Sequence, residues 1–418
     1  MPHRVLYACE TAQISGAEIV LLNLIGSINR SLYEPRALCP PGGPLRPRLA
    51  DLAVPAQVIR FPRLRRTLRS AALELPRLRG FSRRLRTYLR QQQIDIVHAN
   101  SWGAHIACAS AAVECGAITV WHMHSIFRRR WPNGWALRAA ARSADRIICV
   151  SHAVARELEA WGIPAAKLTV ICNGLDLDER FQPRPPTGLL HSQYGLPADA
   201  QLVATIGQLT PGKGQDLFIR AAASIAAAHP RAVFLVVGAP LFGDQRWPRH
   251  LQRLAQQLGI QDRVMFTGTR DDMPRVLAEV RFVVHASVAA DSLPTVLMEA
   301  GAMAKPAIAT VSGGAPEIIE DHRTGLLVPP GDAEAMAAAM DRLLSDAETA
   351  AAMGAAARRV IEQRFTIGQY VRQVEELYRE LLLAPVAASS DRPRGAAGKV
   401  MSGGRDPNAP QRPGENKR

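Results

Sequence analysis

Several features are missing from this 418-residue sequence, and each absence argues against a class of protein. No apolar run is long enough to span a bilayer, and the N-terminal segment lacks the apolar core of a signal peptide. The six cysteines are scattered, without a C-x-x-C pair or a Cys/His cluster, which predicts buried reduced thiols rather than disulfides or zinc ligands. We therefore expect a cytoplasmic protein, soluble or attached peripherally to the inner face of the plasma membrane.

Acidic residues are also scarce, because 37 Asp and Glu stand against 51 Lys and Arg, giving a formal net charge of +14. Such a charge indicates an anionic partner. Nucleic acid is disfavoured, since no helix-turn-helix, zinc finger or aromatic RNA-binding motif accompanies the charge. Arginines recur among leucines from Arg60 to Arg90, where Glu74 is the only acid. This stretch is interpreted either as a pair of solvated basic helices covering a sheet or as a surface for anionic lipid headgroups.

What the sequence does contain is a repeated alternation of short apolar runs and helical stretches. The alternation predicts an α/β protein with two parallel-sheet domains facing each other across a cleft. The first domain is expected over residues 1–183, ending in a proline-rich linker, and the second over residues 184–365, followed by a helix over 366–384 and a disordered tail over 385–418. The predicted strands are Val5–Cys9, Ile94–His98, Ile118–Trp121, Arg146–Val150 and Leu168–Ile171, then Leu202–Ile206, Val233–Val237, Val264–Thr267, Phe282–His285 and Ala307–Thr310.

Two glycine-containing loops have the composition of phosphate-binding turns. Gly16 ends the loop after the first strand and opens an apolar helix, where free N–H groups suit a phosphate. Lys213 lies between Gly212 and Gly214 at a strand-to-helix turn, and an ammonium group placed there neutralises a phosphate well. Gly214 stands where a P-loop carries Ser or Thr, which disfavours a P-loop NTPase.

The most informative motif joins Asp291 and Glu299, which have seven residues between them. Asp291 lies in a loop, and Glu299 lies on an apolar helix that begins at Thr295 and offers its first N–H groups to a phosphate. Together with the two glycine loops, this motif predicts a binding site for a polyhydroxylated, phosphorylated ligand. The pair Asp176 and Asp178 looks like a metal-binding D-x-D sequence, but it leads into the linker and is interpreted as capping, so no metal site is predicted.

The motifs occur in a specific order along the chain. They are Gly16-Ala17-Glu18, Asp95-Ile96-Val97-His98, Trp121-His122-Met123-His124, Cys149-Val150-Ser151, Asn173-Gly174-Leu175-Asp176, Gly207 to Gly214, Asp291 to Glu299, Ser312 to Glu317, and Thr324 to Val328. This ordered set resembles the retaining glycosyltransferases of family 4, whose GT-B fold has two Rossmann-like domains and a C-terminal helix that returns to the first. The resemblance implies a hexosyltransferase-type enzyme that moves a sugar, with retention, from a nucleotide-diphosphate donor to a glycan or lipid-linked acceptor. It implies neither a metal nor a separate cofactor. A GT-B nucleotide-sugar epimerase and a non-catalytic sugar-nucleotide binding protein are the alternatives.

The resemblance also implies roles for particular residues. Glu299 would hold the donor ribose, Asp291 would contact the transferred sugar, and Lys213 would neutralise the diphosphate. The implied donor-binding residues are Gly16, Gln208, Lys213, Thr295, Val296 and Glu299, and the implied catalytic residues are His124 and Asp291.

Three of the implied site positions differ from the family pattern or have a rival nearby. His124 would lie beside the reacting carbon, with His122 as a rival two residues earlier on the same strand. Gln208 stands where the family usually carries an arginine that pairs with the diphosphate. Asp291 replaces the usual glutamate, and its shorter side chain could change which hydroxyl of the sugar the carboxylate contacts.

Overall fold

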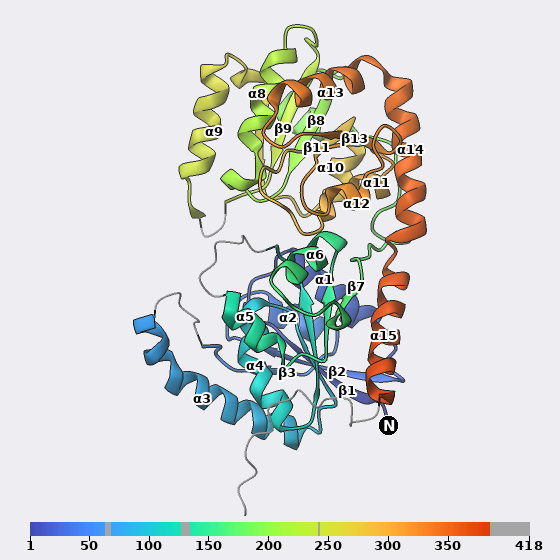
Figure 1. Ribbon diagram of the computed structural model, residues 1–418. Helices are drawn as coiled ribbons and strands as arrows, with labels where there is room; N and C mark the ends of the chain where they lie inside the picture. The colour runs from blue at the N-terminus through green and yellow to red at the C-terminus, as the bar shows by residue number, and fades with distance from the viewer. Residues whose placement is uncertain (63–67, 127–133, 241–242, 385–418) are drawn as a thin grey trace, which may run out of the picture.

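The computed structural model describes residues 1–62, 68–126, 134–240 and 243–384 and shows two α/β domains, one above the other (Figure 1). Each domain is a parallel sheet covered by helices, which confirms the predicted GT-B fold class. The tail over 385–418, predicted to be disordered, lies outside the described residues. Among the residues described, no helix has the length and apolar character needed to cross a membrane.

The first domain, in its described part, contains a seven-stranded sheet with the order β3-β2-β1-β4-β5-β6-β7. The strands are β1 (His3–Ala8), β2 (Tyr33–Cys39), β3 (Ala56–Val58), β4 (Ile96–Ala99), β5 (Ile118–Met123), β6 (Arg146–Cys149) and β7 (Leu168–Val170). The helices are α1 (Gly16–Ser27), α2 (Leu45–Asp51), α3 (Leu68–Gln91), α4 (Trp102–Glu114), α5 (Gly134–Ala141) and α6 (His152–Ala160). β2 and β3 were not among the predicted strands, because β2 contains Pro35 and β3 has only three residues.

The second domain, as far as it is described, has a six-stranded sheet with the order β10-β9-β8-β11-β12-β13. The strands are β8 (Gln201–Ile206), β9 (Ala232–Val237), β10 (Val264–Gly268), β11 (Phe282–His285), β12 (Ala307–Thr310) and β13 (Gly325–Val328). The helices are α7 (Leu189–Tyr194), α8 (Gln215–Ile225), α9 (Arg246–Gln257), α10 (Met273–Glu279), α11 (Thr295–Ala302), α12 (Ala315–Ile318), α13 (Ala333–Ser345) and α14 (Ala347–Arg364), with a short 3₁₀ turn over Pro211–Lys213. The predicted strands omitted β13, whose four residues begin with a glycine.

The chain crosses between the domains a second time where α14 gives way to α15 (Ile367–Leu383), which lies against the first domain (Figure 1). At this crossing the Leu175 N–H donates to the Phe365 carbonyl at 2.8 Å, and the Ile367 N–H donates to the Leu175 carbonyl at 2.8 Å. A side chain at Gly174 would bring its Cβ within 2.5 Å of the Thr366 carbonyl oxygen. Glycine at 174 therefore lets the two connections run in contact.

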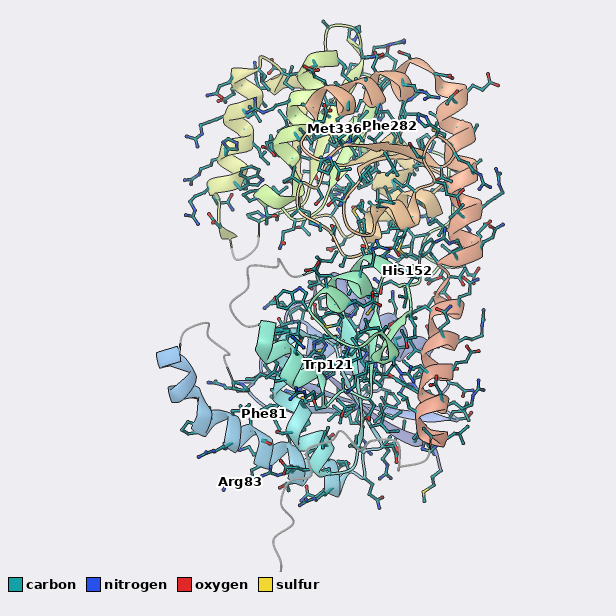
Figure 2. The ribbon with its side chains drawn as sticks, in the orientation of Figure 1. Phe81, Arg83, Trp121, His152, Phe282 and Met336 are labelled. Carbon is teal, nitrogen blue, oxygen red and sulfur yellow. The ribbon has the colours of Figure 1, made fainter. Side chains whose placement is uncertain are left out.

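The arginine-rich stretch forms one long helix, α3, with Pro76 inside it, rather than the expected pair of helices. Residues 63–67 lie outside the described part of the chain. Phe81, Leu85 and Leu89 are buried, and α3 packs beside α4, so the apolar stripe in this half of the helix belongs to the core. Arg83 points away from the domain (Figure 2). In this half of α3 the outer face is therefore basic, while the inner face is covered by the domain.

Candidate active site

A lysine and an aspartate from two neighbouring loops form an ion pair at the carboxyl edge of the second sheet. Lys213 lies in the 3₁₀ turn after β8, and Asp291 lies in the loop after β11. The Lys213 ammonium binds the Asp291 carboxylate, and His285 Nε2 lies 3.4 Å from the same carboxylate oxygen. Burial lowers the pKa of His285 to about 4 although Asp291 opposes the shift, so the imidazole is neutral at physiological pH. From the sequence, His285 was predicted only as the end of a strand.

Three glycines allow these loops to approach one another. Gly214 has φ +65°, and a Cβ there would lie 2.0 Å from the Ala286 carbonyl oxygen. Gly313 has φ +58°, and its Cβ would lie 1.8 Å from the Asp291 carbonyl oxygen. The Gly314 N–H donates to that same carbonyl at 2.8 Å. Since a side chain fits at neither Gly214 nor Gly313, these glycines fix where Asp291 meets Lys213.

The helix that follows the Asp291 loop carries the other predicted acid. Thr295 and Val296 open α11, so their N–H groups belong to the first turn, where a helix has no internal acceptors. Glu299 lies one turn further on and is partly buried. Burial raises its pKa to about 7, while Arg180 acts in the opposite direction. The carboxylate therefore lies in surroundings that disfavour its charge until a hydrogen-bond donor reaches it.

Gly16 and Gln208 stand at the two remaining predicted loop positions. Gly16 is exposed at the start of α1, and a Cβ placed on it would meet no atom within 4 Å. The Gln208 carbonyl accepts a hydrogen bond from the Gln215 side chain at 2.9 Å, which ties the β8 loop to α8. The roles of both residues toward a donor stay predictions.

His124 follows β5 directly and is held by Asn100. His124 Nε2 lies 3.0 Å from Asn100 Oδ1, and Asn100 Nδ2 donates to the Ala17 carbonyl at 3.1 Å. Because the Ala17 carbonyl only accepts, the amide orientation is set, and Nε2 of His124 must carry the proton. Burial lowers the pKa of His124 to about 3. His124 is thus a neutral imidazole whose Nδ1 is left as a hydrogen-bond acceptor.

The rival histidine has different surroundings. His122 is fully buried, with Nδ1 3.2 Å from His98 Nε2, and His98 Nδ1 lies 2.6 Å from the Tyr378 hydroxyl on α15. Burial lowers the pKa of His122 and that of His98. His122 and His98 therefore belong to the interior of the first domain, and His124 is the partly exposed histidine at this strand end.

The two halves of the site meet at Ser292. Its hydroxyl donates to the His124 carbonyl at 2.6 Å, while the preceding residue, Asp291, binds Lys213. The path from Ala17 through Asn100, His124 and Ser292 to Asp291 is therefore continuous across the domain boundary. Asn100 and Ser292 were not among the predicted site residues, although Asn100 lies just beyond the predicted strand Ile94–His98 and directly after β4, a place where site residues gather in parallel sheets.

The D-x-D sequence has the capping geometry expected from its place before the linker. Asp176 Oδ1 accepts from the N–H groups of Asp178 and Glu179 at 3.1 and 3.0 Å. Within the described residues, no group of three or more His, Cys, Asp or Glu side chains is arranged to hold a metal ion.

Two Rossmann-like domains, each built on a parallel sheet, are the architecture of the GT-B class. Residues 14–179 match the family described as Glycosyltransferase Family 4, and residues 188–360 match Glycosyl transferases group 1. The chain therefore belongs to glycosyltransferase family 4.

Named relatives agree with this assignment. A D-inositol 3-phosphate glycosyltransferase of Kineococcus radiotolerans is 32% identical over 73% of this chain and 75% of that enzyme. A GDP-mannose-dependent phosphatidylinositol monomannoside mannosyltransferase of Mycolicibacterium smegmatis is 35% identical over 53% of this chain, and the match spans 59% of that enzyme. The Anabaena protein HepE, solved in complex with UDP-glucose, has a TM-score of 0.78 at 25% identity and covers 90% of this chain and 99% of its own.

Proposed function

We propose that this glycosyltransferase moves a sugar, with retention and without a metal ion, from a nucleoside diphosphate donor to a hydroxyl of a glycan or lipid-linked acceptor. The observation that carries the proposal is the arrangement of Lys213 and Asp291 on one domain and His124 on the other, joined through Ser292. This arrangement offers a cation for a diphosphate and, beside it, an acid and a neutral imidazole for sugar hydroxyls.

Each group has a chemical task in the proposed reaction. Lys213 and the first N–H groups of α11 stabilise the charge that develops on the leaving diphosphate, a task that a divalent ion performs in other enzymes. Glu299 accepts hydrogen bonds from the ribose hydroxyls, which supply the partners that its buried carboxylate needs. His124 Nδ1 accepts a hydrogen bond from a sugar hydroxyl, because Asn100 occupies its other nitrogen.

Retention follows from attack on the face that the diphosphate leaves. The acceptor oxygen bonds to the anomeric carbon as the bond from that carbon to the phosphate oxygen breaks. The acceptor proton passes to the departing phosphate oxygen, so no protein carboxylate forms a covalent intermediate. Lys213 then stabilises the negative charge on the departing phosphate. In the free enzyme the Lys213 ammonium forms an ion pair with Asp291.

The acceptor is proposed to be presented at an anionic membrane surface through α3. The exposed residues Arg77, Arg79, Arg83, Arg84 and Arg90 lie on its described part. Since Phe81 and its neighbours are buried, the contact would be electrostatic rather than an insertion into the bilayer. Binding of this kind weakens as salt rises.

A donor screen tests the proposed activity. UDP-, GDP-, ADP- and CDP-sugars are compared for thermal stabilisation, and the best donor is then incubated with membrane extract as the source of acceptor. Transfer of labelled sugar supports the proposal. An altered free sugar nucleotide would instead indicate an epimerase, and binding without turnover would indicate a sensor.

Substitution then tests the donor site. Lys213→Ala is expected to lower kcat/KM by about 100-fold or more, because it removes a positioned cation from the leaving group. Glu334→Gln, on the exposed side of α13, is a control that leaves activity unchanged. An anomeric configuration opposite to that of the donor would rule out retention, and complete loss of transfer in excess chelator would rule out metal independence.

A further inference from the structure

The loop between β11 and α11 makes two hydrogen bonds to the first domain at the site. The Ser292 hydroxyl donates to the His124 carbonyl at 2.6 Å, and the Ser292 carbonyl accepts from the Ser151 hydroxyl at 2.6 Å. Ser151 is buried at the N-cap of α6, where its oxygen also accepts from the Val154 N–H. One serine of the second domain is therefore bonded on both sides to the first domain.

A second contact reinforces the same junction. The Glu317 carboxylate, on α12, accepts from the N–H groups of His152 and Ala153 at 2.8 and 2.7 Å. These groups open α6, where a helix has unsatisfied donors and a partial positive charge. Figure 2 shows His152 at the boundary between the domains. An acid from the second domain therefore caps the N-terminus of α6.

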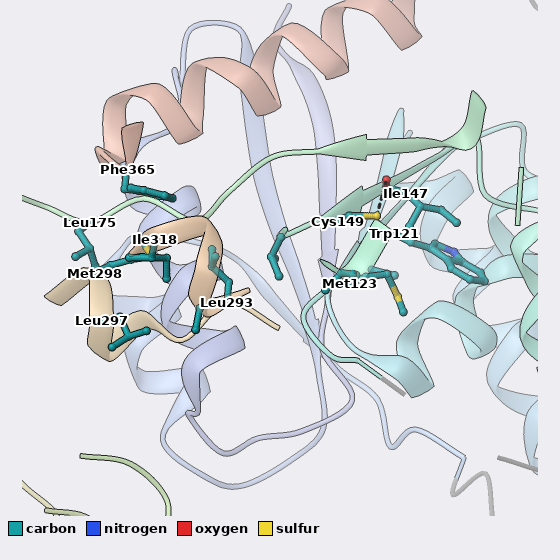
Figure 3. Packing of buried hydrophobic residues seen from close by; sticks show 14 of the residues in the cluster. Trp121, Met123, Ile147, Cys149, Leu175, Leu293, Leu297, Met298, Ile318 and Phe365 are labelled. Carbon is teal, nitrogen blue, oxygen red and sulfur yellow. Dashed lines mark hydrogen bonds between the residues drawn. The ribbon is translucent and has the colours of Figure 1, made fainter. Parts of the chain in front are cut away.

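Apolar packing continues beneath these hydrogen bonds. Leu293 is 4% exposed and belongs to one buried cluster with Met123 and Cys149 of the first domain (Figure 3). On its other side the loop rests on Gly313 and Gly314, where no side chain fits. Ser292 is thus flanked along the chain by a buried leucine and by the aspartate that pairs with Lys213.

We propose that Ser292 is a positioning residue that sets the distance between the Asp291 carboxylate and the His124 imidazole across the domain boundary. The inference rests on the proposed function, because those two groups would contact the same sugar. Asp291 and Ser292 are consecutive, so the bond from Ser292 to the His124 backbone links the two catalytic positions through very few covalent bonds. A displacement of about 1 Å at a reacting centre lowers rates by as much as about 100-fold.

The role predicts a specific kinetic signature. Ser292→Ala removes the bond to His124 but keeps the backbone carbonyl that accepts from Ser151. We expect kcat to fall by about 10-fold, which combines one lost hydrogen bond with looser positioning. The affinity for the nucleoside diphosphate should stay within about twofold, because Lys213, Glu299 and α11 are untouched. Ser292→Thr keeps a hydroxyl and should recover most of the rate.

The experiment compares wild type, Ser292→Ala, Ser292→Thr and the control Ser224→Ala, an exposed serine that bonds only within α8. The measurements are kcat, donor KM, thermal midpoint, and hydrogen exchange of the segments 121–126 and 151–155. Ser292→Ala should lower kcat and raise exchange in these segments by several-fold while the thermal midpoint stays near that of the control. Equal kcat in Ser292→Ala and Ser224→Ala would overturn the role.

Two other outcomes have separate meanings. A rate loss accompanied by a large fall in thermal midpoint, and not recovered by threonine, would show that Ser292 is only structural. A wild-type protein that binds donor but transfers no sugar would overturn the proposed function. Hydrogen exchange would then decide by itself whether the Ser292 hydroxyl holds His124, and unchanged exchange in Ser292→Ala would refute the contact.

Discussion

Replacing Glu299 with glutamine should stabilise the donor-free protein at alkaline pH and weaken its response to donor. Burial raises the pKa of Glu299 from 4.5 to about 7. In the unfolded chain this carboxyl ionises near its ordinary pKa, so between pH 4.5 and 7 the folded state holds more protons than the unfolded state. Stability therefore falls as the pH rises through this window, and the full cost of ionisation is present above pH 7.

The magnitude follows from the size of the window. Each pH unit is worth about 1.4 kcal/mol, so the interval from 4.5 to about 7 corresponds to roughly 3 kcal/mol at most. Glu299 is only partly buried, and solvent screening reduces this to about 1–2 kcal/mol. For a domain of this size the change equals roughly 3–6 °C in thermal midpoint. Glutamine carries no charge, so its advantage should be largest at pH 8 and vanish near pH 4.5.

The assay is thermal unfolding of wild type and Glu299→Gln at pH 8 and pH 5, without donor. Glu334→Gln, at an exposed site, corrects for the loss of one surface carboxylate. With a saturating sugar nucleotide at pH 8 the order should reverse, because only the wild type gains strong ribose hydrogen bonds. If Glu299→Gln shifts the midpoint equally at both pH values, the Glu299 carboxylate is not held in poorly solvated surroundings.

Three further outcomes are expected. Asn100→Ala should lower kcat by about 10-fold or more while nucleotide binding is retained, measured by steady-state kinetics, because His124 loses the partner that fixes its tautomer; unchanged kcat would contradict that assignment. Gly313→Ala should destabilise the protein by more than about 2 kcal/mol in denaturant unfolding, since the new Cβ meets the Asp291 carbonyl oxygen; wild-type stability would contradict the packing at that loop. Arg83→Ser with Arg84→Ser should weaken sedimentation with anionic vesicles at low salt, whereas Arg253→Ser with Arg359→Ser should not; equal loss in both pairs, or binding insensitive to salt, would contradict a role for α3.

The sequence predicted those features that depend on local pattern. Alternating apolar runs identified the fold class and most central strands, because buried parallel strands are continuous apolar segments. Edge strands such as β3 were not predicted, because three residues are too few to show an apolar run. The predicted helix pair from Arg60 to Arg90 was wrong, since Pro76 was compatible with one helix.

For the candidate site too, residues with a local sequence signal were predicted and residues without one were not. Lys213 and Asp291 were recognisable because glycine-flanked lysines and loop acids are local signals, and the structure brings these two together. Asn100 and Ser292 were not recognisable, because their partners lie 24 and 168 positions away along the chain. Hydrogen bonds between positions far apart in the chain leave no periodicity in a single sequence, so only the tertiary structure could reveal them.

The ion pair at the site also bears on why this chain tolerates Gln208. With a glutamine in place of the family's arginine, Lys213 is the side-chain cation that the structure places at this loop, and in the free enzyme Asp291 already neutralises it. In the proposed reaction a diphosphate would therefore share the ammonium with Asp291, and simple nucleotide binding would be weaker for it. The first turn of α11 begins three residues after Ser292, and the helix itself fixes the direction of its N–H groups. Charge lost at position 208 would then be offset by a fixed helix terminus, whose field costs no reorganisation when the diphosphate leaves.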